Sequence, residues 1–511
     1  MKVEENGERS TFMEALDARS PCKAEPLDVK KEASPDASEE EETCPLCTPK
    51  DERDKELWVA CFQCKTWFHV VCLGLDDVEA YDKWCCASCQ ALGYSHKMRG
   101  PRRRSKREHA TTDYAAIQDG RPPDPLRRWE EYMAYCAPLP DIARRVSAST
   151  WTREWLASDA YALDTPTIVP SSPDGVPAIR GMRAPPRTTS IRDIANWVGP
   201  ETNVEVIDVR TQMSSSSWTL DDWASYFETP AAEREKLLNV ISLEVTGTRM
   251  EEMVAAPAMV AESDWVERDW PRDKRPAAED ASKWPKVQRY VLMGVQGAFT
   301  DFHIDFAASY VYYHVIWGKK VFLFAPPTPA NLNAYRAWTS SARQEAEWLG
   351  DSLQRLARVE IVAGETMLIP AGWIHAVHTP QDTLVIGGNF LSDFNVAMHW
   401  RLEELEIATR VPRKFRFPHL MRLAWYVARG WSERLPMELA PRVHDGIRHL
   451  CRRLEQELET MQETDAEGQR TIKARKAHDS VPHDTVPDPR ALVQKLHNFV
   501  DDAPRKRQRH H

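Results

Sequence analysis

The sequence predicts a multidomain protein in which a small cysteine-rich module precedes a larger, mainly β domain with flanking helices and a C-terminal helical region. Eight of the eleven cysteines lie between Cys44 and Cys89. Short runs of β-branched and aromatic residues, separated by turn signals, fill the middle of the chain, and helical spacing follows residue 396. At 511 residues the chain is also too long for one compact core.

Composition narrows the class of protein. Hydrophobic residues make up 42% and charged residues 28% of the chain, as in soluble globular proteins. There is no run of eighteen apolar residues and no signal-peptide pattern, so we expect neither a membrane span nor secretion. In a chain that is not secreted, clustered cysteines favour metal binding over disulfides.

Two charge blocks flank the cysteine-rich segment. Residues 1–43 are rich in Glu, Asp, Ser, Pro and Lys and are predicted to be disordered. The stretch KMRGPRRRSKR (97–107) carries seven basic residues and no acid. Such a block is typical of a solvated linker, and it equally fits a nuclear-import signal or a contact with DNA.

The middle of the chain has the pattern of a β-sandwich or barrel. Its strand-like stretches, dense in β-branched and aromatic residues, are 287–300, 309–326, 358–377 and 382–391. Residues 330–357 have a helical spacing that interrupts these strands, and residues 445–462 form a predicted amphipathic helix.

The cysteine cluster has the ligand spacing of two zinc sites. Four consecutive pairs, each separated by two residues, supply seven thiolates and one imidazole, enough for two tetrahedral sites. The pairs are Cys44 and Cys47, Cys61 and Cys64, His69 and Cys72, and Cys86 and Cys89. Four such pairs within 46 residues are not expected by coincidence.

This spacing resembles that of a PHD finger, as do WFH (67–69) and the tryptophan two residues before Cys86. The resemblance implies cross-braced pairing that leaves Cys85 spare: Cys44, Cys47, His69 and Cys72 would hold one zinc, and Cys61, Cys64, Cys86 and Cys89 the other. It also implies that Trp58 and Trp67 are walls of a methyl-lysine cage, in which a quaternary ammonium gains cation–π attraction. The alternative is that both tryptophans only pack within the finger.

A second candidate metal site begins with TDFHIDF (300–306). In a β-strand His303 and Asp305 point to the same face and could hold one metal ion together, although a lone His-x-Asp also arises by chance. Non-haem iron needs two histidines and one carboxylate, with open positions left for co-substrate and dioxygen. IPAGWIHAVHTP (369–380) offers His375 and His378, which face opposite sides of a strand, so only one can serve.

The segments TDFHIDF, YYHVIWGKKVF, IPAGWIHAVHTP and LVIGGNFL together resemble a JmjC domain of the histone demethylation protein 1 family. The resemblance implies a double-stranded β-helix, a cupin-like jelly roll, and it selects His375 as the third iron ligand beside His303 and Asp305. It extends upstream through NVISLEVT (239–246) and downstream through TRVPRKFRFP (409–418).

The co-substrate 2-oxoglutarate has a distal carboxylate that needs a buried cation. Lys320 would lie unpaired beside the His-x-Asp strand without a ligand, whereas the adjacent Lys319 faces the other way. The resemblance assigns Lys320 and Thr300 to this carboxylate. It also places Tyr313, Asn239 and Asn389 near the co-substrate or oxygen site.

The resemblance implies an Fe(II)- and 2-oxoglutarate-dependent dioxygenase in the nucleus that demethylates histone lysine and releases succinate and formaldehyde. The family branch suggests mono- and dimethylated lysine-36 of histone H3 in the nucleosome. One departure is FAASYVYYH, which replaces the Gly-Gly-Thr-Ser run usual in this branch and puts substrate preference in doubt. Alternatives are a JmjC protein or RNA hydroxylase and a non-catalytic chromatin adaptor.

The expected organisation has six segments. They are a disordered acidic N-terminus (1–43), a PHD-type zinc finger (44–90), a basic linker (91–125), a JmjC oxygenase with an N-terminal extension (126–395, core about 240–395), a helical region (396–462) and a disordered tail (463–511).

Overall fold

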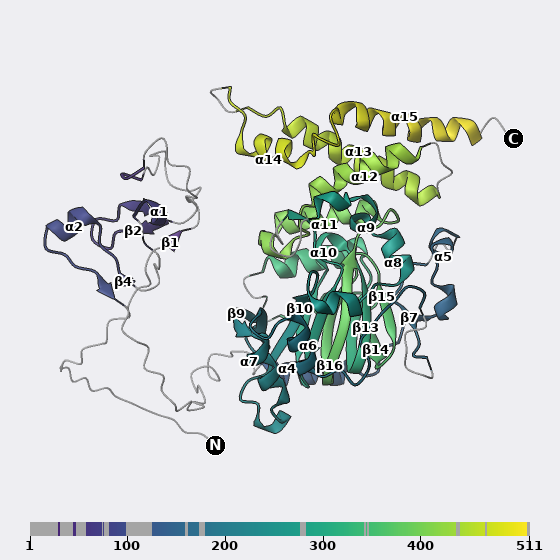
Figure 1. The fold of residues 1–511 in the computed structure, drawn as a ribbon, viewed down its shortest axis with the longest axis horizontal. Coiled ribbons are helices and arrows are strands. Elements are labelled where there is room, and N and C mark those ends of the chain that lie inside the picture. The colour runs from purple at the N-terminus through teal and green to yellow at the C-terminus, as the bar shows by residue number, and fades with distance from the viewer. Residues whose placement is uncertain are drawn as a thin grey trace, which may run out of the picture. The chain divides into compact units, whose positions relative to one another are not determined.

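The computed structural model describes residues 29–30, 44–47, 58–73, 75, 81–98, 125–158, 162–172, 179–275, 283–341, 344, 347–435, 440–464 and 468–507. The chain divides into two units, residues 1–118 and residues 119–511, both drawn in Figure 1. Most of the predicted disordered N-terminus and basic linker lies outside the described residues.

The first unit is a small module with little regular structure. Its strands form one three-stranded antiparallel sheet, β1–β2–β3, and one two-stranded pair, β4–β5. The elements are β1 (Val29–Lys30), β2 (Trp58–Ala60), β3 (Trp67–His69), α1 (Val70–Leu73), β4 (Tyr81–Lys83), α2 (Ala87–Ala91) and β5 (Lys97–Met98). Cysteines make up much of its buried interior, as expected of a fold organised by metal.

The second unit is a double-stranded β-helix, which confirms the fold predicted from the sequence. Two long strands, β13 (Tyr310–Ala325) and β16 (Ile374–Phe390), pair antiparallel along most of their lengths. Irregular register at residues 315–321 bends both strands, and Gly318 sits in the bend at φ +90°. A Cβ at Gly318 would lie 2.2 Å from the Asp382 carbonyl oxygen, so only glycine fits there.

The bend lets each long strand serve two sheets. The first half of β13 pairs with β15 (Thr366–Ile369) and its second half with β14 (Ala357–Val362). The first half of β16 pairs with β12 (Phe299–His303) and its second half with β11 (Tyr290–Gly294). The sheet continues from β11 through β10 (Leu238–Glu244), β8 (Asn203–Asp208) and β9 (Met213–Thr219), and from β15 through β7 (Thr167–Val169) and β6 (Arg144–Arg145).

Side-chain alternation along β13 explains why it is buried on both faces. Val311, Tyr313 and Val315 belong to one apolar cluster, with Phe322 and Phe324 from the second half of the strand. The alternate residues, including Tyr310 and Tyr312, join a larger cluster on the opposite face. A strand covered on both sides reads as a continuous apolar run, as this one does.

Helices cover the sheet and extend the unit at its C-terminal end (Figure 1). Those before β10 are α4 (Pro125–Tyr135), α5 (Arg153–Ser158), α6 (Ile191–Val198) and α7 (Leu220–Glu228). Between β10 and β11 lie α8 (Ala258–Ser263) and α9 (Trp265–Asp269), and α10 (Pro329–Thr339) lies between β13 and β14. Those after β16 are α11 (Val396–Ala408), α12 (Leu420–Arg434), α13 (Pro441–Thr460), α14 (Ile472–Ser480) and α15 (Pro489–Arg507). The helical spacing read over 330–357 yields only α10 and a short 3-10 turn, Leu349–Ser352.

The structure differs from the expected disordered tail after residue 463. Helices α14 and α15 form there, and Val493, Leu496 and Val500 of α15 are buried in one apolar cluster with α12 and α13. Their spacing of three and four residues is an apolar stripe that the polar composition of the tail conceals.

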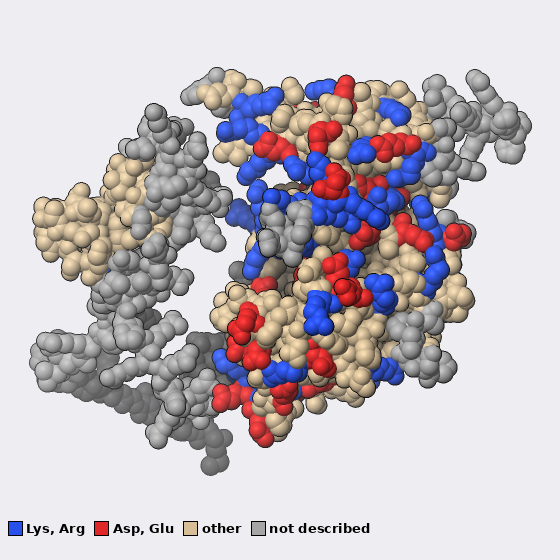
Figure 2. Space-filling view, in the orientation of Figure 1, with Lys and Arg blue, Asp and Glu red and all other residues tan. Residues whose placement is uncertain are grey.

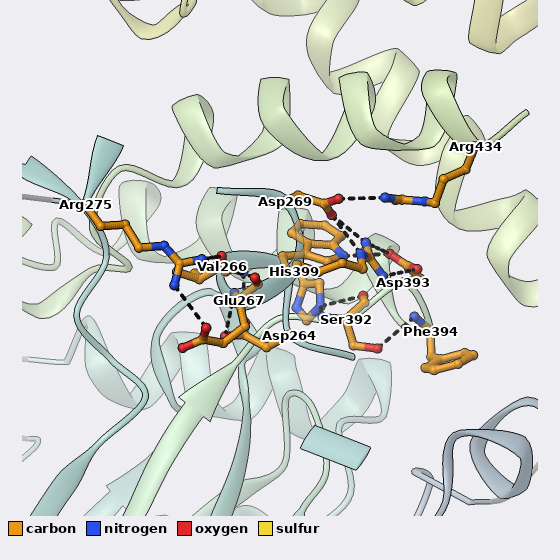
Figure 3. Close-up of polar contacts among 12 residues, drawn as sticks. Asp264, Val266, Glu267, Asp269, Arg275, Ser392, Asp393, Phe394, His399 and Arg434 are labelled. Atoms are coloured by element: carbon orange, nitrogen blue, oxygen red, sulfur yellow. Dashed lines mark hydrogen bonds and ion pairs between the residues drawn. The ribbon is translucent and has the colours of Figure 1, made fainter. Parts of the chain in front are cut away.

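A buried polar network connects α12 with α9 and with the segment that follows β16 (Figure 3). Arg268 lies between two carboxylates, 2.7 Å from Asp269 and 2.6 Å from Asp393, and Arg434 of α12 also reaches Asp269 at 2.9 Å. Because Asp393 is the third residue after β16, the network fixes the segment that leaves this strand against α9 and α12. Among the described helices, none is long and apolar enough to span a membrane.

Candidate active site

Pairing between β12 and β16 brings the predicted triad together. His303, the last residue of β12, lies directly opposite His375, the second residue of β16. Asp305 lies just past the end of β12, so it reaches the site from the following turn. The His375 Nε2 atom is 3.7 Å from the Asp305 Oδ2 atom, and the three donor atoms all lie within 4.8 Å of one another.

Each histidine of the triad is held in one tautomer by its own backbone. The Nδ1 atom of His303 donates to the Asp301 carbonyl at 2.8 Å, and that of His375 donates to the Trp373 carbonyl at 3.0 Å. Each Nε2 lone pair is therefore left for a metal. Burial lowers the pKa of His375 to about 4, which keeps its imidazole neutral and able to coordinate.

Asn389 orients the carboxylate of the triad. Its Nδ2 atom lies 3.2 Å from the Asp305 Oδ1 atom and 2.9 Å from the Ser309 hydroxyl. With one oxygen held by Asn389, the other carboxylate oxygen faces His375. Sequence reasoning placed Asn389 near the co-substrate or oxygen site, and the structure shows that it contacts the carboxylate.

His378 lies away from the triad. It is three residues beyond His375 on β16, and it pairs with Phe299 and Val321. It belongs to no metal-ligand group of the described residues, and burial lowers its pKa to about 4. The alternation expected of a strand therefore separates the two histidines as predicted.

The triad opens into a cavity of about 720 Å³ between the barrel strands and α11. Apolar side chains of the barrel interior form its walls, among them Val311, Phe322, Ile369 and Val377. Because the three donors lie together at one wall, the remaining side of a bound ion would face this space. The donor set and its open side fit the two-histidine, one-carboxylate arrangement of non-haem Fe(II) sites, whereas structural zinc closes all four positions.

Lys320 is the buried cation of this cavity. It is 4% exposed, and its ammonium donates to the Thr379 hydroxyl at 2.7 Å. It forms no ion pair with any described carboxylate, and burial lowers its pKa to about 7. Lys319 faces the other side of β13 and pairs with Glu360 at 2.7 Å. A buried lysine without an anion favours an anionic ligand, such as the distal carboxylate of 2-oxoglutarate.

The strand positions around Lys320 leave room for its own ammonium group. Gly294 on β11 has no side chain, and a Cβ there would lie 2.5 Å from the Lys320 Nζ atom. Asn239 lies directly opposite Gly294 on β10, is buried, and its Oδ1 atom has no hydrogen-bond partner among the described residues. Asn239 does not line the cavity, whereas Thr300 and Tyr313 do.

The exposed end of the cavity is charged. Glu205 on β8 and Lys414, in the 3-10 turn Arg413–Phe415, form an ion pair of 3.5 Å, and both line the cavity with Glu244 and Phe415. Figure 2 shows acidic and basic side chains interspersed on this unit, with Lys and Arg grouped over the C-terminal helices. An apolar interior with a few polar groups is typical of a small-molecule or cofactor site.

Both cysteine groups of the first unit assemble as the cross-braced pairing predicts. Cys44, Cys47, His69 and Cys72 form one candidate site, and Cys61, Cys64, Cys86 and Cys89 form the other. In each group one sulfur also accepts a backbone N–H, as in His69 to Cys44 at 3.4 Å and Cys86 to Cys61 at 3.2 Å. Cys85 belongs to neither group, and its thiol lies 3.7 Å from the Ser95 carbonyl oxygen. The donor chemistry fits two structural zinc ions.

The two candidate cage tryptophans lie on one face of the small sheet. Trp58 pairs with His69 and Ala60 pairs with Trp67, so Trp58 and Trp67 are diagonal neighbours on the same side. Both side chains are partly buried, and the Trp58 ring lies 3.7 Å from the ring of the ligand His69. Trp58 therefore packs on a candidate zinc ligand and also lies on the sheet face of the predicted cage.

Sequence reasoning missed three side chains that support the site. Thr379 accepts from Lys320, and His399 and Glu406 of α11 contact the turn after Asp305. None has a motif of its own, and only the pairing of β16 with β13 and the docking of α11 bring them into place.

Comparisons with known proteins agree with this geometry. A family model described as a cupin-like domain matches residues 226–400. The chain is 49% identical over 435 residues to JmjC domain-containing histone demethylation protein 1 of Mycosarcoma maydis, and the match covers 75% of this chain and 65% of that protein. It is 38% identical over 395 residues to the protein of the same name from Yarrowia lipolytica, covering 75% and 74% respectively.

A human relative is more distant. The chain is 37% identical over 385 residues to human Lysine-specific demethylase 7A, covering 74% of this chain and 38% of that protein. The chain thus spans just under two thirds of the Mycosarcoma protein and well under half of the human one. From the shared barrel and these identities, the chain belongs to the JmjC domain-containing histone demethylation protein 1 family.

Proposed function

We propose that this protein is an Fe(II)- and 2-oxoglutarate-dependent histone lysine demethylase that acts in the nucleus on mono- and dimethylated lysine-36 of histone H3. The observation that carries the proposal is the open three-donor site, His303, Asp305 and His375, at the wall of a cavity that also contains the unpaired Lys320. Relatives named as histone demethylases support the substrate class.

The residues of this chain would bind and orient the reactants. His303, Asp305 and His375 would hold the iron, and Lys320 would bind the distal carboxylate of 2-oxoglutarate. When bound, iron and 2-oxoglutarate supply an oxidation by dioxygen that yields succinate and carbon dioxide and hydroxylates an N-methyl carbon, which leaves as formaldehyde. The apolar walls, including Val311 and Phe322, would exclude water from the reaction.

The zinc finger would act as a chromatin reader. Trp58 and Trp67 lie on one face of its sheet, where aromatic faces attract a methylated ammonium. A finger that binds one methyl-lysine raises the effective concentration of other histone lysines at the iron site. The basic linker would add salt-dependent contacts with DNA phosphates.

The test uses nucleosomes that each carry one methylated lysine, at position 9, 27 or 36 of histone H3. Purified protein is incubated with Fe(II), ascorbate and 2-oxoglutarate, while mass spectrometry follows the histone and formaldehyde is assayed. We expect loss of methyl mass from the lysine-36 substrate with equal release of formaldehyde. The His375→Ala variant should lose at least about 1,000-fold in activity, because an iron ligand is removed. The matched His378→Ala variant should retain activity.

Other outcomes identify other functions. Demethylation of another lysine would keep the chemistry and reject the lysine-36 assignment. A gain of oxygen mass without formaldehyde would indicate a protein hydroxylase, and the same result on an RNA substrate would indicate an RNA hydroxylase. No reaction on any substrate, with nucleosome binding intact, would indicate a non-catalytic chromatin adaptor.

A further inference from the structure

The turn that follows Asp305 has an unusual backbone. Ala307 and Ala308 are consecutive residues with φ angles of 48° and 49°, in the left-handed region that residues with a Cβ rarely adopt. Both are completely buried, and neither lines the active-site cavity. A turn of two strained alanines persists only where the surrounding structure holds it.

Two buried side chains of α11 hold this turn. The Glu406 carboxylate accepts the Ala307 N–H at 2.8 Å, and the His399 Nδ1 atom donates to the Ala307 carbonyl at 3.0 Å. Glu406 is 7% exposed and His399 is fully buried. Both polar groups of the first strained residue are therefore satisfied by side chains of one helix.

His399 is itself fixed on its other side. Its Nε2 atom lies 3.4 Å from the backbone nitrogen of Ser392, which follows β16 (Figure 3). Because Nδ1 carries the proton that the Ala307 carbonyl accepts, Nε2 is free to accept from this N–H. The imidazole thus connects the end of β16 to the turn after β12, the two strands that carry the histidines of the triad.

Contacts lead from the turn to the Asp305 carboxylate. The Ser309 N–H closes the turn by donating to the Phe306 carbonyl at 3.0 Å. The Ser309 hydroxyl then lies 2.9 Å from the Asn389 amide, which also contacts Asp305. The turn therefore fixes both the chain direction at Asp305 and the position of Ser309, which Asn389 contacts together with that carboxylate.

We propose that Glu406 and His399 are positioning residues for metal binding: they hold the Ala307–Ala308 turn in its left-handed conformation and so aim the Asp305 carboxylate at the metal. The proposal rests on Asp305 being a ligand, as in the proposed function. It assigns α11 a role beyond closing one wall of the cavity. Supporting groups that orient metal ligands typically change metal affinity by about 10–100-fold when removed.

The test measures affinity for Co(II), which can be titrated without turnover, in the full-length protein without oxygen. Glu406→Met removes the acceptor for the Ala307 N–H, and we expect affinity to fall at least about tenfold. Glu406→Gln keeps an acceptor oxygen and should stay within about threefold of the unchanged protein. Glu403→Met is the matched control on the same helix, because Glu403 pairs with Arg453 at 3.2 Å, and it should leave affinity unchanged.

The decisive experiment asks whether glycine in the turn restores the lost Co(II) affinity. Glycine adopts the left-handed conformation without a Cβ penalty, so Ala307→Gly with Ala308→Gly should restore most of the affinity lost in Glu406→Met. The same glycine pair should change affinity little on its own. Restoration is not expected if Glu406 acts only by packing or by its charge. Should Glu406→Met fail to fold, His399→Leu with the same glycine pair provides the second comparison.

The outcomes separate the two proposals. If His303→Ala binds Co(II) as tightly as the unchanged protein, the triad is not the metal site and the proposed function fails. If the triad binds Co(II) but Glu406→Met and His399→Leu keep full affinity, or lose it without glycine rescue, only the positioning proposal is overturned.

Discussion

The two candidate metal regions of this protein differ in how much of the fold depends on the metal. In the finger, the ligands are themselves the interior: Cys44, Cys61, Cys86 and Cys89 are buried in an apolar cluster that holds few other large side chains. In the oxygenase unit, the triad lies beside apolar clusters that do not include its residues. We therefore expect the small module, with so little apolar burial, to need metal to fold, and the barrel to fold without it.

The donor sets of the two regions also differ in whether they leave open positions around a bound metal. Four donors per zinc leave no open position, as structural sites require. Three donors on one side of a cavity leave positions for other ligands. Metal removal should therefore unfold the first unit, whereas the second unit should stay folded and lose only its activity.

The largest expected effect is on the finger. Removing zinc with a chelator should unfold residues 44–90, because binding of structural zinc contributes about 10–16 kcal/mol in finger peptides. The barrel should keep its cooperative thermal transition. Hydrogen exchange read by mass spectrometry would follow both units in one sample. Retained protection in the finger after stoichiometric zinc loss would show that its fold does not depend on the metal.

A smaller effect is expected from the buried lysine. Lys320→Met keeps the volume but removes the charge, so affinity for 2-oxoglutarate should fall about 30-fold or more, since truncating one partner of a buried charge pair costs about 2–5 kcal/mol. Without co-substrate the same change should raise the free energy of unfolding by about 1–3 kcal/mol, because a poorly satisfied buried group is lost. Calorimetric titration and thermal unfolding measure the two quantities.

Lys319→Met is the control for this variant. Lys319 is partly exposed and pairs with Glu360, so its removal should change stability by less than about 1 kcal/mol and leave co-substrate affinity intact. If both lysine variants bind 2-oxoglutarate equally, the cavity assignment of Lys320 is wrong.

Strand alternation explains why much of the site could be predicted from sequence. A two-residue period places Lys319 and Lys320, and likewise His375 and His378, on opposite faces of their strands. The family resemblance then selected Lys320 and His375 as the site residues, so that the other member of each pair serves as a control. Ligand spacing identified the four cysteine and histidine pairs, and the resemblance to a PHD finger implied how they divide into the two groups. These are local regularities, and they survive without knowledge of the tertiary fold.

Long-range packing could not be predicted in this way. The contacts of Glu406 and His399 with Ala307 join residues about 90 to 100 positions apart, and Asn389 reaches Asp305 across 84 positions. The left-handed turn at two alanines has no local sequence signal, because alanine does not favour it. The helices after residue 463 were missed because their buried stripe lies within a polar composition.

The smallest expected effect is a pH dependence of co-substrate binding. In the folded protein without ligand the pKa of Lys320 is about 7, well below the value of 10.5 for an exposed lysine. A dicarboxylate pairs with the protonated form, so above pH 7 binding must take up a proton. Affinity should therefore weaken by up to about tenfold per pH unit above 7, as linkage requires. Nearby His378 stays neutral in this range, because burial lowers its pKa to about 4.

Calorimetry in buffers of different ionisation enthalpy measures this proton directly. With Mn(II) in place of iron and without oxygen, we expect uptake of nearly one proton at pH 8 and little at pH 6. The stability of the protein without ligand depends on pH in the opposite direction. Between pH 7 and 10.5 the unfolded chain binds more protons at Lys320 than the folded chain does. The contribution of Lys320 to the free energy of unfolding therefore rises with pH in this range. Lys320→Arg, if it binds the co-substrate, should remove both dependences because arginine stays protonated. Binding without proton uptake at pH 8 would mean that Lys320 is already charged in the empty cavity, which would contradict the lowered pKa of this lysine.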